Sequence, residues 1–533
     1  MTTRPTVTPA SDAPTSPAPD DHVRAVARGG ALNLIGSIVY GATNFAFLAV
    51  ITNELGAVRA GPVIVAIAVF TVVSRFAELG ASTGLVRLIS RDRALGRTER
   101  IGPTIIAAVI PVLLVGIAAA YALTAAADGL ASLFGGGGHT NDIAHLVRIL
   151  APFLPIASIY TVLVQGSRGF GTMQVLVWID KITRACALPV VAFIVLRTGG
   201  GATGVVLAWA ITTALAALVT IGAVVRLTRA QHPPAVEVHL DRREIVQSFW
   251  SFSLPRAAGQ SFDVAVLWLD TLLVAALIGP TAAGIYAAGT RFLLIGTFTA
   301  EAIQQAVAPR VSTLLALGRH DEARTVIQQA TTWQAAITWP VYLGVIAFSG
   351  ALLGIFGPGY GQAGTALTLL SVGLLVAVVG GPSDAVILMS GRSRQSLFNS
   401  LVAFVINLGG NLVLVPIWGI SAAGGVWAAT LVVAAGLPAW QARRSLGLAP
   451  WSPALARTIA VAAGTVGVAA VGARALFGDT LAGLTAAVVL GGIPYGMLMY
   501  RLRGSIHLDS LIASFRGPRR VPSDPPRLTW TPS

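Results

Sequence analysis

The chain repeats itself, and this repeat constrains the fold more than any other feature. The segment from Leu55 to Gly61 recurs 223 positions later as the segment from Ile278 to Gly284. Further aligned pairs are Glu78 with Glu301, Arg87 with Arg310, Asp180 with Asn407, Arg184 with Asn411 and Pro189 with Pro416. Two copies of one mostly apolar unit therefore follow each other, which is typical of membrane proteins built from repeats.

The composition indicates an integral membrane protein. Apolar residues make up 55% of the chain and charged residues only 11%, and the mean hydropathy is +0.76. Apolar runs long enough to cross a bilayer as a helix fall at roughly 31–54, 62–86, 102–124, 147–166, 173–196, 203–226, 249–277, 283–309, 331–356, 363–390, 396–417, 421–442, 455–477 and 480–501. We therefore expect an all-α integral membrane fold of about 14 transmembrane helices, with two parallel six-helix repeat lobes plus two C-terminal helices.

Arginines predict the orientation, because short cytoplasmic loops collect Lys and Arg. They gather in the even loops, at Arg91, Arg93, Arg97, Arg100, Arg168, Arg229, Arg242, Arg243, Arg319, Arg324, Arg392, Arg394, Arg443 and Arg444. Odd loops hold only single arginines, such as Arg59, Arg197 and Arg474. Both termini are therefore expected inside. Each copy has an even number of spans, so the two lobes enter the membrane the same way round.

These boundaries divide the chain into six parts. We expect a disordered cytoplasmic tail over 1–27, an N-lobe over 28–227, a cytoplasmic linker over 228–246, a C-lobe over 247–446, two further helices over 447–502 and a second cytoplasmic tail over 503–533. The formal charge of +14 is explained by this topology, and no nucleic-acid partner is expected. Cys186 is the single cysteine, so no intramolecular disulfide can form.

Ionisable residues inside the spans are the candidate functional groups, because each costs at least about 2.5 kcal/mol at the bilayer centre unless it faces a cavity or a partner. In span seven, Arg256, Gln260, Asp263 and Asp270 fall on one helical stripe. This stripe predicts a substrate or proton path, and packing against polar neighbours is the alternative. Asp263 and Asp270 are candidates to bind a coupling H⁺ or Na⁺.

The other spans carry fewer charges, and for most of them a structural role is an equal or better explanation. Asp180 and Arg184 in span five can pair at i and i+4, and Arg75 and Glu78 in span two can pair at i and i+3. Arg184, Arg75 and Arg291 are candidate cavity cations. Glu78 and its repeat equivalent Glu301 are further coupling candidates, although their equivalence suggests a shared scaffold role. Asn407 and Asn411 add polar groups to the cavity or join helices.

The loops limit the chemistry. The longest outer loop, at about 125–146, contains Gly135 to Gly138 and little else, and no glycine-rich phosphate-binding turn of an ATPase is present in the sequence. Neither a catalytic domain nor a metal site is indicated. A paired-lobe membrane protein with a charged seam is therefore predicted to be a transporter that alternates between inward-open and outward-open states, and not an enzyme.

Several segments resemble a known family. They are Leu55 to Gly61, the arginine-rich loop after span two, Gln165 to Gly171, Ser390 to Arg394, Asn407 to Pro416, and Gly419. Together they resemble polysaccharide-biosynthesis flippases of the multidrug/oligosaccharidyl-lipid/polysaccharide exporter superfamily, over roughly residues 28–502. Asn53 departs from the pattern, since such proteins often carry a basic residue at the end of span one.

The resemblance implies a substrate. Such flippases have fourteen spans and move polyprenyl-diphosphate-linked oligosaccharides from the inner to the outer leaflet of the bacterial cytoplasmic membrane, for O-antigen-type or other cell-surface polysaccharides such as lipopolysaccharide. The implied partners are this lipid-linked glycan, membrane lipids and polysaccharide-assembly enzymes, and no cofactor is implied beyond H⁺ or Na⁺. Arg256, Arg291 and Arg184 are the candidates to bind the diphosphate, because arginine offers a fixed fork of donors to phosphate oxygens.

Three alternatives stay open at this point. A lipid II flippase or a cation-coupled drug exporter of the same superfamily would share the fold, and the charge of the cavity would discriminate between them. A membrane glycosyltransferase, polymerase or ligase would need carboxylates at an outer loop, whereas the acids here lie in the helices. A scaffold without transport would have an apolar seam between its lobes.

Overall fold

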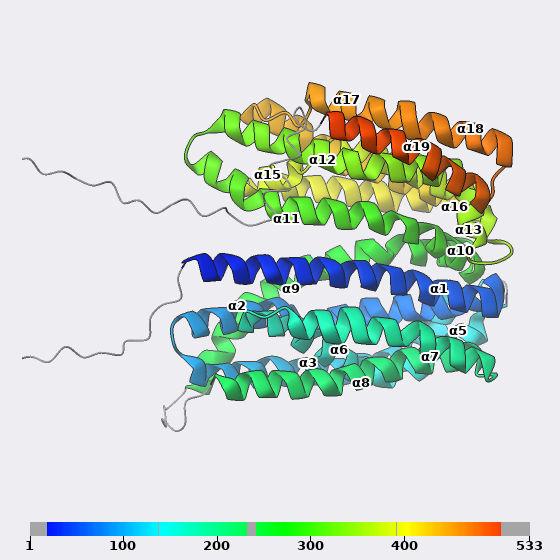
Figure 1. Cartoon of the computed structure of the whole chain (residues 1–533). Coiled ribbons are helices and arrows are strands. Elements are labelled where there is room, and N and C mark those ends of the chain that lie inside the picture. Colours follow the sequence, from blue (N-terminus) through cyan, green and yellow to red (C-terminus); the bar gives the residue numbers. More distant parts are fainter. Residues whose placement is uncertain (1–18, 137, 232–240, 391, 503–533) are drawn as a thin grey trace, which may run out of the picture.

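The computed structural model describes residues 19–136, 138–231, 241–390 and 392–502. All regular elements in these ranges are helices (Figure 1). The first half contains α1 (Pro19–Ala77), α2 (Ala81–Ala94), α3 (Ile101–Ala125), α4 (Ala127–Phe134), α5 (Thr140–Leu150), α6 (Leu154–Gly166), α7 (Ala185–Arg197) and α8 (Gly201–Ala230). Short 3₁₀ turns at Thr98–Arg100, Ala151–Phe153 and Ser167–Phe170 and a π-helix, η4 (Val175–Arg184), connect them.

The second half has the same all-helical character. It contains α9 (Arg242–Leu277), α10 (Pro280–Thr290), α11 (Leu294–Ala316), α12 (His320–Ala347), α13 (Ser349–Gly354), α14 (Gly364–Val378), α15 (Ser383–Met389), α16 (Ser393–Leu446), α17 (Pro453–Ala462), α18 (Val468–Phe477) and α19 (Leu481–Arg501). Its 3₁₀ turns are η5 (Arg291–Leu293) and Tyr360–Ala363, and a π-helix at Ala463–Gly467 joins α17 to α18.

Eight helical stretches of the described chain are long and apolar enough to cross a membrane. Two of them, 43 and 53 residues long, would reach about 65 and 80 Å as straight helices, far beyond the roughly 30 Å of a hydrocarbon core. Non-helical glycines interrupt both. The chain is therefore a multi-pass membrane protein, and the expected number of fourteen spans stays a prediction.

Glycines make the sharp reversals at one end of the bundle. Gly56 within α1 has φ +70°, Gly279 between α9 and α10 has φ +129°, and Gly419 within α16 has φ +62°. Side chains with a Cβ rarely adopt this backbone region. The repeat-related Gly56 and Gly279 therefore both allow a backbone turn that other residues rarely adopt. We name this side of the molecule the Gly56 end.

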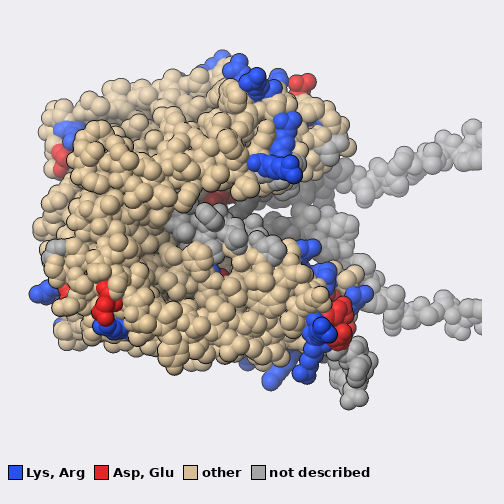
Figure 2. Space-filling view, turned by 180° about the vertical axis from the view of Figure 1, so that it is seen from behind, with Lys and Arg blue, Asp and Glu red and all other residues tan. Residues whose placement is uncertain are grey.

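The opposite side collects arginines and is named the basic end. It holds Arg91 and Arg93 in the last turn of α2 and Arg443 and Arg444 in the last turn of α16. Figure 2 shows Lys and Arg gathered at this end of both halves, while the surface between the ends is almost free of charge. The prediction that these arginine-rich loops share one side is confirmed. Their cytoplasmic location stays a prediction.

Helix α9 belongs to both halves. At the basic end, the Trp250 indole donates to the Ala107 carbonyl of α3 at 3.1 Å, Arg100 pairs with Glu244 at 3.0 Å, and Arg87 of α2 lies over the Phe252 ring at 4.0 Å. At the Gly56 end, Asp270 hydrogen bonds to α16. The first turns of the predicted C-lobe therefore pack on the first half, because their aromatic residues are buried there.

The two C-terminal helices pack on the second half. The Tyr495 hydroxyl of α19 donates to the Ala336 carbonyl of α12 at 2.6 Å. Between α18 and α19, Asp479 accepts from the backbone N–H groups of Gly350 and Ala351 at 3.1 and 2.9 Å. A carboxylate at a helix N-terminus satisfies free backbone donors, so Asp479 fixes this hairpin to α13.

The two halves touch closely at the Gly56 end. Gly61 of α1 and its repeat equivalent Gly284 of α10 face each other, and a Cβ on Gly284 would lie 3.0 Å from the Gly61 Cα. The Asn53 amide donates to the Ile355 carbonyl at 2.7 Å. Phe45 packs on Phe292 and Phe356 with centroids 5.3 and 4.8 Å apart, which adds an aromatic contact. Together these contacts join the halves at the Gly56 end, while Figure 2 shows a hollow between them toward the basic end.

Replacing Gly61 with alanine should separate the halves at the Gly56 end. The new Cβ would lie 2.6 Å from the Pro280 carbonyl carbon, and forced overpacking costs about 1–3 kcal/mol. We expect faster maleimide labelling of a cysteine placed at Ser421, which lines a cavity of about 560 Å³ at this interface, in a Cys186→Ser background. Gly222→Ala is the matched control, because no atom lies within 4 Å of that site. Equal labelling of both variants would contradict the expectation.

Candidate functional site: a cavity between the two halves

A cavity of about 380 Å³ lies among α1, α6, η4, α7 and α8 on one side and α9, η5 and α11 on the other. Its charged lining residues are Arg75, Asp180, Arg184 and Arg291, and its aromatic lining residues include Tyr40, Phe70, Tyr160, Trp209, Trp268 and Phe298. Three of the four predicted cavity cations therefore line one space. Their role toward a substrate stays a prediction.

The cavity is layered along its depth. Near the Gly56 turn, α1 contributes Phe47, Ile51, Ile64 and Ile67, which are apolar. Farther from the turn, its two arms contribute Tyr40, Thr43, Asn44, Thr71, Ser74 and Arg75. The end nearest the closed side is therefore apolar, and the end toward the basic side can form hydrogen bonds.

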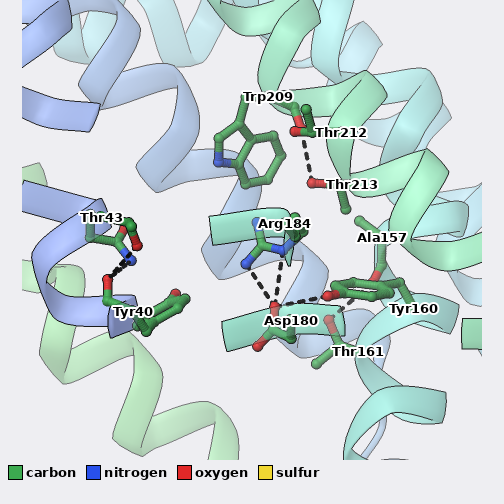
Figure 3. A network of polar contacts seen from close by, with 11 residues as sticks. Tyr40, Thr43, Ala157, Tyr160, Thr161, Asp180, Arg184, Trp209, Thr212 and Thr213 are labelled. Carbon is green, nitrogen blue, oxygen red and sulfur yellow. Dashed lines mark hydrogen bonds and ion pairs between the residues drawn. The ribbon is translucent and has the colours of Figure 1, made fainter. Parts of the chain in front are cut away.

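Arg184 is held by a polar network on the wall of the first half (Figure 3). Its guanidinium Nε and Nη2 donate to Asp180 Oδ1 at 2.9 and 2.8 Å, and the Tyr160 hydroxyl donates to the same oxygen at 2.8 Å. The side chains of Arg184 and Asp180 are 12% and 16% exposed. The ion pair proposed from the i, i+4 spacing is confirmed, and the pair also lines the cavity.

A π-helix presents this pair. The segment η4, from Val175 to Arg184, is a π-helix of ten residues, and π-helical turns are rare and often mark functional sites. Lys181 of the same segment points elsewhere, since its ammonium donates to Asn33 Oδ1 at 2.9 Å and to Ser37 Oγ at 2.7 Å. The sequence predicted a regular helix here, because propensity and hydropathy do not encode the wider turn.

Arg75 is also paired. Its Nη1 lies 3.2 Å from Glu78 Oε1, and the two side chains are 38% and 5% exposed. Glu78 is thus buried behind the cavity, whereas Arg75 reaches into it. Glu301, the repeat equivalent of Glu78, is exposed on α11. The two repeat-equivalent glutamates therefore lie in different surroundings, and their expected roles stay predictions.

Arg291 differs from the other two arginines. Its guanidinium carbon lies 6.0 Å from the centroid of the Trp268 ring, and its Nε is buried without a hydrogen-bond partner among the described residues. The acids of the cavity wall and its border, Asp180 and Glu78, already pair with Arg184 and Arg75. Within the described part of the chain, Arg291 is therefore the cavity cation without an acid partner.

Asp270, Asn407 and Asn411 form a second polar cluster, apart from the cavity lining. Asn411 Nδ2 donates to Asp270 Oδ1 at 2.9 Å and to the Asn407 carbonyl at 2.8 Å, and the Tyr286 hydroxyl lies 3.5 Å from Asp270 Oδ2. Asp270 is 3% exposed, Asn407 1% and Asn411 0%. Of the two roles considered for these asparagines, the joining of helices fits the structure, because both are buried in packing against α9 and neither lines the cavity.

Three further predicted site residues are described only as positions on a helix. Arg256, Gln260 and Asp263 lie on α9, but their side chains fall outside the described residues. The polar stripe of span seven thus stays a prediction except at Asp270. Sequence reasoning missed Tyr160, Tyr40, Trp209 and Trp268 as cavity residues. Aromatic residues are common in apolar spans, so no sequence signal separated these four from residues that face lipid.

Comparison with solved structures identifies the fold. The chain is similar to an inward-facing multidrug-resistance MATE-family transporter of the MOP superfamily, with a TM-score of 0.62, 16% identity and coverage of 81% of this chain and 99% of that chain. It is also similar to the lipid II flippase MurJ in an inward closed conformation, with a TM-score of 0.63, 13% identity and coverage of 92% and 99%.

A third structure shares the fold and shows that the pocket can vary. A MOP-superfamily transporter from Pyrococcus furiosus with a binding pocket of reversed polarity matches with a TM-score of 0.52, 16% identity and coverage of 80% of this chain and 96% of that chain. No curated protein sequence matches the chain. The chain therefore has the fold of these MOP-superfamily transporters.

The family follows from the sequence itself. The family described as "Polysaccharide biosynthesis protein" matches residues 26–315, which is more than half of the chain, and the MatE family matches residues 255–413. The chain therefore belongs to the polysaccharide biosynthesis protein family. This confirms the resemblance that the repeat and loop motifs indicated.

Removing Asp180 should destabilise the protein, because Arg184 is then left without its ion-pair partner. Loss of one member of a buried pair costs about 3 kcal/mol, because the other charge stays unpaired. We expect Asp180→Ala to lower the melting temperature in detergent more than the double variant Asp180→Ala/Arg184→Leu, in which both charges are gone. Melting of the double variant below the single variant would show that the pair is not the main interaction of either residue.

Proposed function

We propose that this protein is a flippase that moves a polyprenyl-diphosphate-linked oligosaccharide from the inner to the outer leaflet for cell-surface polysaccharide assembly, by alternating access. The observation that carries the proposal is Arg291, a cation facing the cavity between the two halves without an acid partner in the described chain. A guanidinium left in this state calls for an anion, and phosphate oxygens fit its fork of donors.

The layered cavity supports the same substrate. A sugar headgroup cannot cross hydrocarbon unaided, because each unpaired hydroxyl costs roughly 2–7 kcal/mol. The layer around Tyr40, Asn44 and Gln165 offers hydrogen bonds at the depth where the headgroup would lie. The prenyl chain can stay in the surrounding lipid.

The charge of the cavity separates this proposal from its rivals. An exporter of cationic drugs needs free acids in its cavity, whereas the acids described at this cavity, Asp180 and Glu78, are paired with arginines and Arg291 adds a positive charge. A lipid II flippase shares the diphosphate, and similarity to MurJ over 92% of the chain keeps it as the second candidate. A glycosyltransferase needs carboxylates at an outer loop, and a scaffold would not need an open cationic cavity.

Energy would come from the membrane. We place the protein in the bacterial cytoplasmic membrane with the basic end and both termini inside, as the arginine bias favours. Moving negative charge outward then runs with the membrane potential, which contributes about 2.3 kcal/mol per charge per 100 mV. The membrane potential would therefore favour outward movement of the protein with bound substrate, and only the return of the empty protein to the inward-open state would need a coupling ion.

Asp270 is our candidate for that ion. It is a buried carboxylate without a cation partner in the described chain, and the nearby Asn411 Oδ1 is buried without a hydrogen-bond partner. A bare charge is unfavourable in such a site, so a proton or a Na⁺ would neutralise it. Oxygen atoms of Asp270, Asn411 and Asn407 suit either ion.

Replacing Arg291 tests the substrate. We expect Arg291→Gln to weaken binding of a polyprenyl-diphosphate-linked oligosaccharide about 30-fold in nanodiscs, since a charge-assisted hydrogen bond contributes about 2 kcal/mol. The affinity of Arg291→Lys should lie between those of the unmodified protein and Arg291→Gln, because lysine keeps the positive charge but lacks the planar set of guanidinium donors. Flipping in proteoliposomes, followed by lectin access to the glycan, should fall in parallel.

Two controls make this test decisive. Arg310→Gln removes an exposed cation from α11, the helix that follows η5, and should leave binding unchanged. Lipid II, presented in the same nanodiscs, tests the second candidate. Normal binding and flipping by Arg291→Gln would refute the proposed diphosphate site. Preferential binding of lipid II by the unmodified protein would identify lipid II, and not the oligosaccharide lipid, as the substrate.

Replacing Asp270 with asparagine tests the coupling ion. This variant keeps the shape and removes the titratable, ion-binding group, so we expect flipping to lose its dependence on a pH or Na⁺ gradient while the affinity for the lipid-linked glycan is retained. Asp384→Asn is the matched control, because Asp384 accepts from Ser396 at 3.0 Å in the same half. Gradient dependence that survives in Asp270→Asn would exclude this site.

A further inference from the structure

The cavity wall of the first half carries four polar groups with free hydrogen-bonding capacity. They are the Tyr40 hydroxyl, Asn44 Oδ1, the Gln165 amide and the Trp209 indole N–H. None has a side-chain hydrogen-bond partner among the described residues, and none is a buried unpaired atom. These groups are therefore open to the cavity.

Neighbouring hydroxyls behave differently. Thr43, Thr71, Thr161 and Thr213 all donate to carbonyls of their own helices, at 2.7 to 3.1 Å. Such local bonds are the usual way for threonine to satisfy its donor inside a helix. The four open groups are thus a separate set, and they can donate and accept at once, as a ring of sugar hydroxyls requires.

Trp209 gives this set an apolar platform. Its ring meets Phe70 edge-on, with centroids 5.3 Å apart and an interplanar angle of 84°. Figure 3 shows the indole beside the Arg184 network, where Tyr160 and Asp180 also lie. An aromatic ring with a polar N–H can cover the apolar C–H face of a sugar and still donate to a hydroxyl.

The anion site lies across the cavity. Arg291 and Trp268 belong to η5 and α9 of the second half, whereas Trp209, Tyr40 and Gln165 belong to α8, α1 and α6. Tyr40 lines the same cavity as both Arg184 and Arg291. A ligand that fills the cavity would therefore contact both halves.

We propose that Trp209, with Tyr40, Asn44 and Gln165, forms a subsite for the sugar residue adjacent to the diphosphate. This inference rests on the proposed flippase function and adds a specificity determinant distinct from Arg291. Arg75 and Arg184 on this wall are already paired with Glu78 and Asp180. The subsite therefore favours a neutral sugar, and an acidic sugar finds no uncompensated cation there.

A site built to hydrogen-bond a substrate discriminates strongly against analogues that lack the matching groups. We expect the unmodified protein in nanodiscs to bind a polyprenyl diphosphate with one N-acetylhexosamine at least about tenfold more tightly than the bare polyprenyl diphosphate. Trp209→Leu should bring this ratio close to one and leave the affinity for the bare lipid unchanged. Arg291→Gln should weaken both ligands equally and leave the ratio intact.

Further variants guard against misfolding. Tyr40→Phe removes only a hydroxyl and should lower the same ratio by a smaller factor. Trp178→Leu is the matched control, since Trp178 is 54% exposed on the outside of η4 and should change neither affinity. The inference is overturned if Trp209→Leu and Tyr40→Phe both keep the ratio of the unmodified protein.

The failure of this subsite can be told apart from failure of the flippase proposal. If the unmodified protein binds both lipids equally and Arg291→Gln weakens both, the diphosphate site stands and the sugar subsite is refuted. If the unmodified protein binds neither lipid, the proposed function fails, and the subsite fails with it.

Discussion

A charge inside a membrane has to be compensated, and this constraint organises the interior of the protein. Asp180 neutralises Arg184, and Glu78 neutralises Arg75, through contacts of 2.8 and 3.2 Å. The guanidinium of Arg291 and the carboxylate of Asp270 have no such ion-pair partner in the described chain. An uncompensated charge costs several kcal/mol, so it persists where a ligand or an ion can supply the missing partner. The unpaired groups are thus the natural places for function.

The polar clusters around Arg184 and around Asp270 occupy equivalent positions of the repeat but differ in charge. Asp180 and Arg184 of the first half align with Asn407 and Asn411 of the second. In the first half the aligned pair is charged and cancels within itself, with the Tyr160 hydroxyl on the shared oxygen. In the second half the aligned pair is neutral and receives Asp270 from α9. Duplication therefore kept the positions of the polar groups and allowed their charges to diverge.

The contact between the two halves at the Gly56 end bears on how the halves would move during transport. Gly61 and Gly284, equivalent in the repeat, lie against each other at the Gly56 end. The absence of side chains allows the two backbones to approach closely. The cavity cations lie between this closure and the basic end, so the halves must rearrange around them if a headgroup is to cross.

The sequence by itself determined the helical membrane class, the glycine turns, the common side of the arginine loops and the candidate charges Arg75, Arg184 and Arg291. Hydropathy, chain reversal and the cost of intramembrane charge are local properties that a sequence carries. Only the tertiary structure decided which of these charges share a cavity, that Asn407 and Asn411 are buried away from it, and that Trp209 and Tyr40 face it. Those outcomes depend on the relative rotation of helices that are far apart in the chain. A helical sequence pattern determines which residues share a face of the helix, but not whether that face contacts lipid, a cavity or another helix.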